Sequence, residues 1–265
     1  MNLRKLIFTE NACYKAGRKI TVKGIMVHST GANNPWLKRY VGPDDGLLGQ
    51  NQYSNHWNTY HPGGREVCVH GFIGKLKDGT IATYQTLPWD HRGWHAGGSA
   101  NNTHIGFEIC EPAGHTYQGG TMVGYDAEKN EDYFRKVYAN AVELTAQLCK
   151  IYRLDPLEDG VILCHSEGHA RGIASNHADV MHWFPKHGKT MDDFRQDVAR
   201  AMKGEEESSA PGKYGRLEDV PAWYRPSLQK LLDKKIVQGT GGGRLDVSED
   251  FCRVVTVLDR LGLLE

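Results

Sequence analysis

Two histidines each end an apolar run, and together they point to metal chemistry. His28 follows the run from Gly24 to Val27, and His165 follows the run from Val161 to Cys164. Short apolar runs of this kind predict buried strands, whose carboxyl ends lie at the edge of an α/β sheet where functional sites tend to form. Imidazole binds zinc, and a catalytic zinc has three protein ligands plus water. The two histidines therefore predict two ligands of one catalytic zinc site.

The third ligand is expected in the segment that follows His165. This segment contains no cysteine up to Phe184, so the candidates are His169, His177, Asp179 and His182. His165 and His169 have the i,i+4 spacing of helical zinc proteases, but Gly168 argues against a helix there and the glutamate is at the wrong offset for an HExxH motif. Spacing alone therefore leaves the third ligand open.

These residues must be positioned by a sheet. Apolar runs rich in Val, Ile, Phe and Thr predict strands over 20–28, 67–75, 80–87, 104–111 and 160–165. An Asp-Gly pair at 78–79 predicts a hairpin between the second and third of them. Apolar residues that recur every three or four positions predict helices over 131–152 and 190–203. Strands mixed with helices predict an α/β domain, with long loops and one short helix in the Gly/Asn/Pro-rich insertion at 31–66.

Composition excludes several functional classes. The chain has 265 residues with 32 basic and 32 acidic side chains, so no surplus of positive charge supports nucleic-acid binding. No apolar run approaches the roughly 20 residues that span a bilayer, which predicts no membrane insertion. The apolar cluster at 6–8 is too short for a signal peptide, so we expect synthesis in the cytoplasm. Six scattered cysteines without a CxxC pair predict no disulfide framework.

A change in composition divides the chain. The stretch at 204–212, Gly-Glu-Glu-Glu-Ser-Ser-Ala-Pro-Gly, has the composition of a solvated linker between residues 1–203 and a tail at 213–265. The tail contains Asp219-Val-Pro-Ala-Trp223, a predicted helix, a glycine-rich turn at 241–243 and a second predicted helix over 248–261. This order resembles a single S-layer-homology module, which implies a small, mainly helical domain that targets a cell-wall polymer. A helical tail that mediates dimerisation is the alternative.

Five ordered motifs within residues 20–184 resemble one enzyme family. They are His28-Ser-Thr-Gly31, Lys77-Asp-Gly-Thr-Ile81, Gly93-Trp-His-Ala-Gly97, Ile105-Gly-Phe-Glu-Ile109 and the segment 165–184. In this order they resemble zinc-dependent N-acetylmuramoyl-L-alanine amidases related to phage lysozyme-amidases and peptidoglycan recognition proteins. The overall pattern is similar to that of a phage or prophage endolysin. The resemblance implies a mixed central β-sheet flanked by helices. It also implies a Zn²⁺ cofactor and hydrolysis of the amide bond between N-acetylmuramic acid and the L-alanine of the peptidoglycan stem peptide.

The resemblance also implies roles for individual residues. The zinc ligands are expected to be His28, His165 and Asp179, because the segment from Asp179 to Phe184 resembles the Asp-Pro-Gly-x-x-Phe run of members with an aspartate ligand. Glu108 falls where many members have a catalytic glutamate. His177 replaces the lysine that often stabilises the oxyanion in this family, and it also remains the alternative third ligand.

Two further residues are expected to face the substrate, namely Trp94 and His95 in the third motif. A competing hypothesis is a peptidoglycan-binding protein of the same fold without catalysis. Recognition relatives that lost activity usually lost a ligand, whereas this chain keeps three metal-capable residues and Glu108. The resemblance to endolysins further implies release to the cell wall through a holin-type pore or by lysis.

Overall fold

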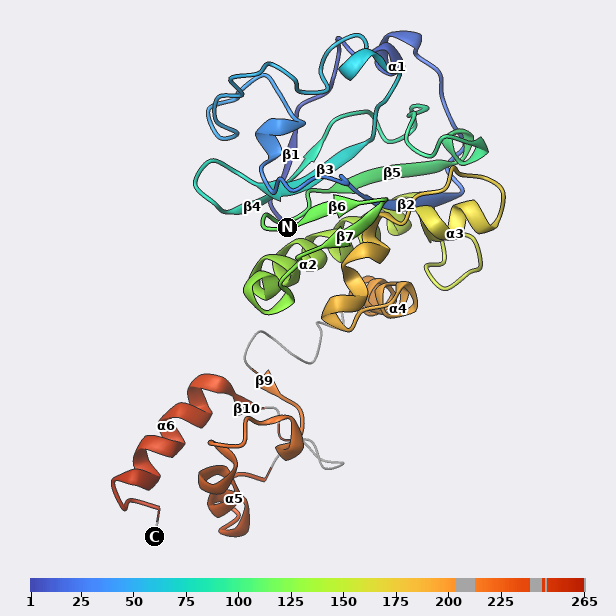
Figure 1. Ribbon diagram of the computed structural model, residues 1–265. Helices are drawn as coiled ribbons and strands as arrows, with labels where there is room; N and C mark the ends of the chain where they lie inside the picture. The colour runs from blue at the N-terminus through green and yellow to red at the C-terminus, as the bar shows by residue number, and fades with distance from the viewer. Residues whose placement is uncertain (204–212, 239–244, 246, 265) are drawn as a thin grey trace. The chain divides into compact units, whose positions relative to one another are not determined.

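The chain forms two compact units, Met1–Met202 and Lys203–Glu265. The computed structural model describes residues 1–203, 213–238, 245 and 247–264 (Figure 1). The predicted linker at 204–212 and the glycine-rich turn at 241–243 lie outside the described residues. Within the described part of the chain, no helix is both long and apolar enough to cross a bilayer.

A six-stranded mixed sheet organises the first unit. Its strands lie in the order β1 (Leu3–Lys5), β4 (Ile81–Gln85), β3 (Gly71–Lys75), β5 (His104–Ile109), β2 (Gly24–Ser29) and β8 (Ile162–Cys164). The β3–β4 hairpin turns at the Asp-Gly pair and is antiparallel, whereas all other neighbours are parallel. The predicted mixed sheet is therefore confirmed. Strand β1 was not predicted, because three residues at a sheet edge show no usable alternation.

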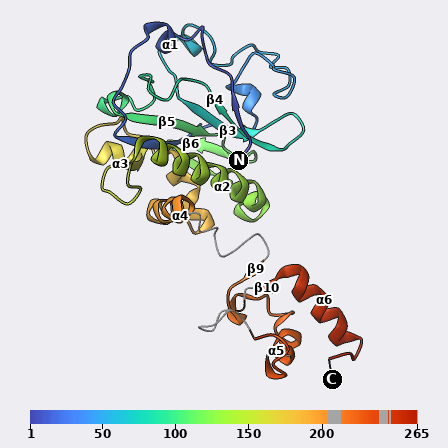
Figure 2. The same cartoon turned by 180° about the vertical axis from the view of Figure 1, so that it is seen from behind.

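Helices cover one face of this sheet. The long helix α2 (Ala127–Tyr152) lies along the sheet in both views, and α4 (Met191–Lys203) packs with it (Figures 1 and 2). Helix α2 begins four residues before its predicted start, because the Asp126 side chain accepts a hydrogen bond from the Lys129 amide and caps it. A short helix α1 (Ala12–Ala16) and a small hairpin of β6 (Thr116–Gln118) and β7 (Thr121–Val123) also belong to this unit.

The prediction that residues 165–170 would not form a helix is wrong. They form helix α3 (His165–Ala170), which begins directly after β8. Its first turn is capped by Glu167, whose Oε2 accepts a hydrogen bond from the Cys164 amide at 3.0 Å. Gly168 is required for packing, since a Cβ atom there would lie 2.4 Å from Cε of Met26. The glycine that argued against a helix therefore allows this helix to approach the sheet.

Alternate side chains of the strands lie on opposite faces of the sheet, so one face carries the hydrophobic core and the other carries the candidate site residues. Ile25 and Val27 of β2 and Phe107 of β5 pack in the core that contains α2. Because successive side chains point to opposite faces of a sheet, His28 and Glu108 lie on the other face. The insertion covers part of that second face through a separate buried cluster that includes Leu37, Tyr40, Leu48 and Phe72. Part of the insertion at 31–66 therefore packs against the sheet through buried apolar side chains.

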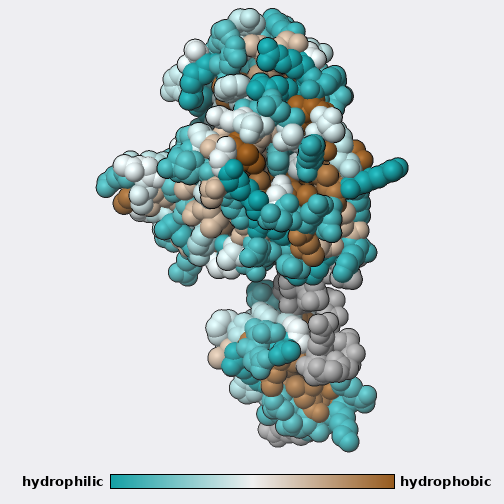
Figure 3. Space-filling model, turned by 90° about the vertical axis from the view of Figure 1, so that its right-hand side faces the viewer, coloured by the Kyte–Doolittle hydropathy of each residue, from teal (hydrophilic) through white to brown (hydrophobic). Residues whose placement is uncertain are grey.

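The second unit is small and mainly helical, as predicted. It contains a two-stranded pairing of β9 (Lys213–Tyr214) with β10 (Val247–Ser248), helix α5 (Arg225–Asp233) and helix α6 (Glu249–Arg260). Its core is formed by Val220, Leu228, Val247 and Cys252. Several apolar side chains stay at the surface of this unit (Figure 3), among them Trp223, Val254, Val257 and Leu261.

Candidate metal centre and catalytic cleft

Three of the predicted ligands meet at one point. His28 comes from β2, His165 is the first residue of α3, and Asp179 begins a 3-10 turn (Asp179–His182). One ligand atom from each residue lies within 4.8 Å of the others. The Oδ2 atom of Asp179 lies 2.7 Å from Nδ1 of His28 and 3.0 Å from Nδ1 of His165. Two imidazole nitrogens and one carboxylate oxygen form a donor set that suits zinc.

The other candidates for the third ligand lie elsewhere. His169 is on α3, where its Nδ1 lies 3.3 Å from the carbonyl oxygen of Ala174, and the ring of His182 packs against Tyr117. The ring of His177 lies tilted beside that of His165, with 4.7 Å between ring centroids, but His177 is outside the three-residue cluster. Of the four candidates, the geometry favours Asp179.

Asp179 has an unusual backbone conformation. Its φ of 48° lies in the left-handed region, where aspartate is among the few side chains found repeatedly. Burial raises the pKa of Asp179, but hydrogen bonds from His165 and His28 outweigh it and hold this pKa well below its usual range. The carboxylate is therefore ionised and aimed between the two rings.

A hydrogen-bond chain determines which nitrogen of His28 is free. Nε2 of His95 lies 3.1 Å from the carbonyl oxygen of His104, which can only accept, so His95 carries its proton there. Nδ1 of His95 then accepts from Nε2–H of His28 at 2.9 Å. Burial lowers the pKa of both His28 and His95, which favours neutral rings. In the neutral ring, the Nδ1 lone pair of His28 is then available to a cation, whereas without a cation the contact with Asp179 needs a proton on Nδ1.

This arrangement fits a cation. A lone pair of His28 and an anionic oxygen of Asp179 lie 2.7 Å apart, and only a proton or a cation between them makes that contact favourable. Gly106 of β5 makes the arrangement possible, since a Cβ atom there would lie 2.4 Å from Nδ1 of His95. The residues present therefore fit a bound zinc ion.

A serine connects the remaining rings on the loop after α3. The hydroxyl of Ser175 lies 3.1 Å from Nε2 of His165 and 3.1 Å from Nδ1 of His177. It also lies 3.3 Å from the carbonyl oxygen of Ala96. Sequence reasoning gave Ser175 no role, because a serine in a polar loop carries no motif of its own.

Glu108 is the other unusual group. It is the register partner of His28 on the adjacent parallel strand, so both side chains lie on the same face. Its Oε2 atom is buried without a hydrogen-bond partner in the described part of the chain. Burial raises the pKa of Glu108 well above its ordinary value, and the charges of Asp179 and Glu111 add to this. Such a carboxyl group can hold a proton and exchange it with a reactant.

These groups open into a cleft of about 630 Å³. Glu108, His165, His177 and Asp179 line it, as do Trp94 and His95, whereas His28 lies behind them with 1% of its surface exposed. The insertion contributes further lining residues that were not predicted as site residues, namely Trp57, Arg65 and Glu66. The spacing of Trp57, Arg65 and Glu66 in the sequence does not indicate a site, because the insertion at 31–66 has no regular period.

Comparisons with known proteins agree with this architecture. The sequence profile of the N-acetylmuramoyl-L-alanine amidase family matches residues 17–182. The crystal structure of the Staphylococcus aureus hydrolase AmiA in complex with its ligand is similar in fold, with 18% identity, a TM-score of 0.51, and coverage of 78% of this chain and 87% of that one. The solution structure of the PlyG catalytic domain is similar at 19% identity and a TM-score of 0.48, covering 80% and 99% of the two chains. No curated protein sequence matches this chain.

Proposed function

Because the chain belongs to the N-acetylmuramoyl-L-alanine amidase family, we propose that it is a zinc-dependent peptidoglycan hydrolase. Its substrate would be the amide bond between N-acetylmuramic acid and the L-alanine of the stem peptide. The observation that carries this proposal is the convergence of three metal donors with an unpaired, buried carboxyl group in one cleft. Metal donors beside a proton-transfer group suit the metal-assisted hydrolysis of an amide.

The proposed roles follow from position. His28, His165 and Asp179 would hold the zinc ion, which lowers the pKa of water and polarises a carbonyl group when it is bound. Glu108 accepts a proton from the attacking water and returns it to the leaving amine of alanine. Burial raises the pKa of Glu108, which makes the ionised carboxylate a stronger base toward the proton of the attacking water.

His177 is proposed to stabilise the oxyanion. If the hydroxyl of Ser175 donates to Nδ1 of His177, the Nε2–H of His177 remains free to donate into the cleft. Trp94 and His95 line the same cleft, where Trp94 is 39% exposed and can contact the substrate. His95 would act mainly through its hydrogen bond to His28.

The C-terminal unit is proposed to target the enzyme to a cell-wall polymer. Its exposed apolar side chains, Trp223 among them, are available for such contacts. A second copy of the unit could cover the same side chains, so dimerisation is the competing role. As in the endolysins that the chain resembles, the enzyme would reach the wall after release through a holin-type pore or lysis.

The proposal is tested by digesting purified peptidoglycan with the full-length protein. We expect new amino-terminal L-alanine without new reducing sugar ends, loss of this activity after chelation, and recovery on adding zinc. The Glu108→Gln variant serves as a control for contaminating hydrolases. A protein that binds peptidoglycan but releases no alanine amino termini, even when loaded with zinc, would instead be the binding protein of the alternative hypothesis.

A further inference from the structure

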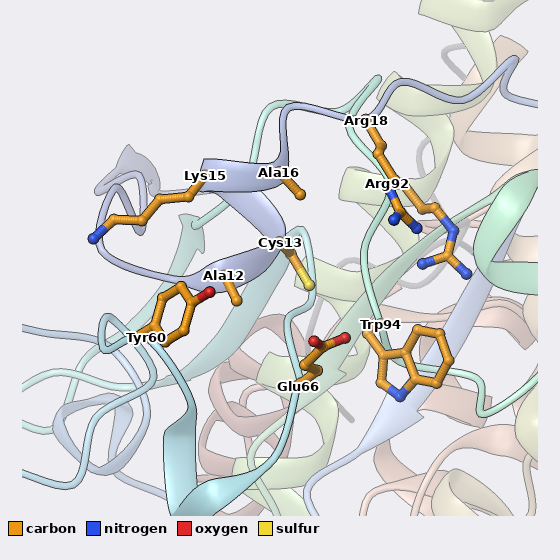
Figure 4. Close-up of a pocket in the computed structure, with 9 residues that line it drawn as sticks. All are labelled: Ala12, Cys13, Lys15, Ala16, Arg18, Tyr60, Glu66, Arg92 and Trp94. Atoms are coloured by element: carbon orange, nitrogen blue, oxygen red, sulfur yellow. The ribbon is translucent and has the colours of Figure 1, made fainter.

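A second pocket adjoins the catalytic cleft. It has a volume of about 270 Å³ and is lined in part by Cys13, Arg18 and Arg92 (Figure 4). Glu66 and Trp94 line both the pocket and the catalytic cleft, so the two spaces meet along these side chains. The pocket therefore lies beside the cleft, within reach of a substrate that extends past Glu66 and Trp94.

Two guanidinium groups in this pocket, those of Arg18 and Arg92, are candidates for binding an anion. Among the described residues, no carboxylate lies within ion-pair distance of Arg18 or Arg92. The third basic lining residue, Lys15, is already engaged, with its Nζ 2.7 Å from Glu10. Glu66 is the acidic lining residue, and its nearest ion-pair partner is His61 at 3.9 Å. With two arginines against one glutamate, the pocket keeps a net positive charge.

The position of Arg92 is fixed before any ligand binds. Its backbone amide donates to the carbonyl oxygen of Arg18 at 2.8 Å, and its Nε donates to Oδ1 of Asn102 at 2.7 Å. Its guanidinium carbon lies 5.0 Å from the centroid of the Trp94 ring. A guanidinium that is stacked and hydrogen-bonded at one edge keeps its other donors available and loses little entropy when it binds an anion.

We propose that this pocket binds a carboxylate of the stem peptide, with Arg18 and Arg92 as the residues that recognise it. This inference rests on the proposed function, because it takes peptidoglycan as the substrate. The lactyl carboxyl group of N-acetylmuramic acid is consumed in the scissile amide, so the anionic groups of the substrate lie on the peptide side. Guanidinium groups bind carboxylates through paired, charge-assisted hydrogen bonds. The pocket thus holds the peptide part of the substrate beyond the scissile bond.

Cys13 provides a direct reporter of occupancy. It is partly accessible and lines the pocket, whereas the other five cysteines of the chain are buried. A hydrogen bond with Cys68 lowers the pKa of the Cys13 thiol, and the charges of Arg92 and Arg18 lower it further against the opposing effects of burial and Glu66. A thiol with a lowered pKa reacts faster with disulfide reagents. A ligand seated between the arginines would shield it.

The test measures the labelling rate of Cys13 by a coloured aromatic disulfide in the full-length protein. The probes are a synthetic stem peptide with free carboxylates and the same peptide with every carboxylate amidated. We expect the free peptide to slow labelling at concentrations roughly 10-fold lower than the amidated peptide, since a charge-assisted hydrogen bond commonly changes affinity by about that factor. Cys13→Ser should remove the fast labelling phase and so identify its source.

Variants assign the effect to the pocket. Arg18→Gln is expected to abolish the difference between the two peptides, whereas Arg135→Gln, a basic residue on α2 paired with Asp132, should preserve it. If the amidase is active, Arg18→Gln should raise KM for a free-carboxylate muropeptide roughly 10-fold with little change in kcat. Labelling requires neither zinc nor turnover, so a failure of the proposed hydrolysis would not remove this readout. Equal protection by both peptides, or stronger protection by a polymer of glycerol phosphate, would overturn the proposal.

Discussion

The candidate metal centre has two sides whose side chains are held in place differently. The strand side consists of His28 on β2 and Glu108 on β5 with His95 beside them, and the loop side consists of Ser175, His177 and Asp179 after α3. On the strand side the proton positions are set by a chain that ends at a backbone carbonyl. On the loop side the link is the hydroxyl of Ser175, which can rotate and both donate and accept.

This difference suits the two sides to different roles, holding a metal ligand on the strand side and responding to substrate charge on the loop side. A fixed acceptor at the end of a buried chain holds one tautomer, so the strand side presents the same donor atom before and after a cation binds. A rotating hydroxyl beside the exposed His177 can change its hydrogen bonds as charge develops in the cleft. We therefore expect mutations of the strand-side histidines to change metal affinity strongly, and mutation of His177 on the loop side to change turnover.

The largest effect is expected from removing a ligand. His28→Ala and Asp179→Ala should each lose stoichiometric zinc and lytic activity together, because two protein donors remain. His177→Ala should keep its zinc and lose turnover. Metal content by mass spectrometry and release of L-alanine amino termini measure the two effects. Zinc lost from the His177 variant but kept by the Asp179 variant would reverse the assignment of the third ligand.

The next largest effect concerns Glu108. Glu108→Gln should reduce turnover by roughly 10²–10⁴-fold, the usual contribution of a general acid–base group, while zinc content stays unchanged. The substitution keeps the size of the side chain, so circular dichroism should report an unchanged fold. Turnover at the wild-type rate in a zinc-loaded variant would exclude Glu108 as the proton-transfer group.

Glu108→Gln should lower turnover but, at neutral pH, stabilise the folded protein relative to the wild type. Burial raises the pKa of Glu108 above its ordinary value of 4.5, so the folded state holds this proton more tightly than the unfolded state does. The stability that this gives is present below pH 4.5 and is lost as the pH rises through the raised pKa. In metal-free protein, the melting temperature of Glu108→Gln minus that of the wild type should therefore increase as the pH is raised from 4.5 to 8. A constant difference across this range would contradict the account.

Smaller effects on zinc affinity are expected when the hydrogen-bond partners of His28 and His165 are removed. His95→Phe keeps a ring but removes the acceptor for His28, and it should weaken zinc binding by roughly 10–100-fold, as is usual for groups that orient a metal ligand. Ser175→Ala removes the corresponding contact of His165 and should weaken binding less, because water can replace an accessible hydroxyl. Competition with a chelating dye measures both affinities. Equal losses would show that the two sides do not differ as we infer.

The smallest effect on chemistry is expected from removing the second unit. A chain ending at Lys203 contains the complete six-stranded sheet with α2 and α4, and it should fold and hydrolyse small soluble muropeptides at the full-length rate. Activity on intact walls should fall if the tail targets a wall polymer, because tethering raises the local concentration of enzyme. Sedimentation of both chains tests dimerisation instead, since a change from dimer to monomer would assign the tail to that role.

Sequence patterns predicted the strand side better than the loop side, for a physical reason. A strand places alternate residues on opposite faces, so an apolar run ending in His28 already fixes where the ring lies. A loop has no such period, and the path that brings Asp179 between two rings depends on its left-handed backbone, which spacing does not reveal. Helix α3 was missed because Gly168 lowers helix propensity, while its close contact with Met26 depends on the tertiary structure. The insertion at 31–66 was predicted as long loops with one short helix, and its buried cluster was not foreseen because it follows no regular period.

The left-handed backbone of Asp179 restricts how this position can change during evolution. A β-branched or bulky side chain is a true outlier at such a φ, while Asp, Asn and Gly are accommodated. Of these three, only aspartate brings a negative charge that offsets a divalent cation. A cysteine thiolate would also supply a negative ligand. A cysteine in this left-handed backbone conformation would, however, destabilise the fold by roughly 1–2 kcal/mol unless the turn adopted another conformation. An exchange of aspartate for cysteine in this chain would therefore need accompanying changes in the residues of the turn.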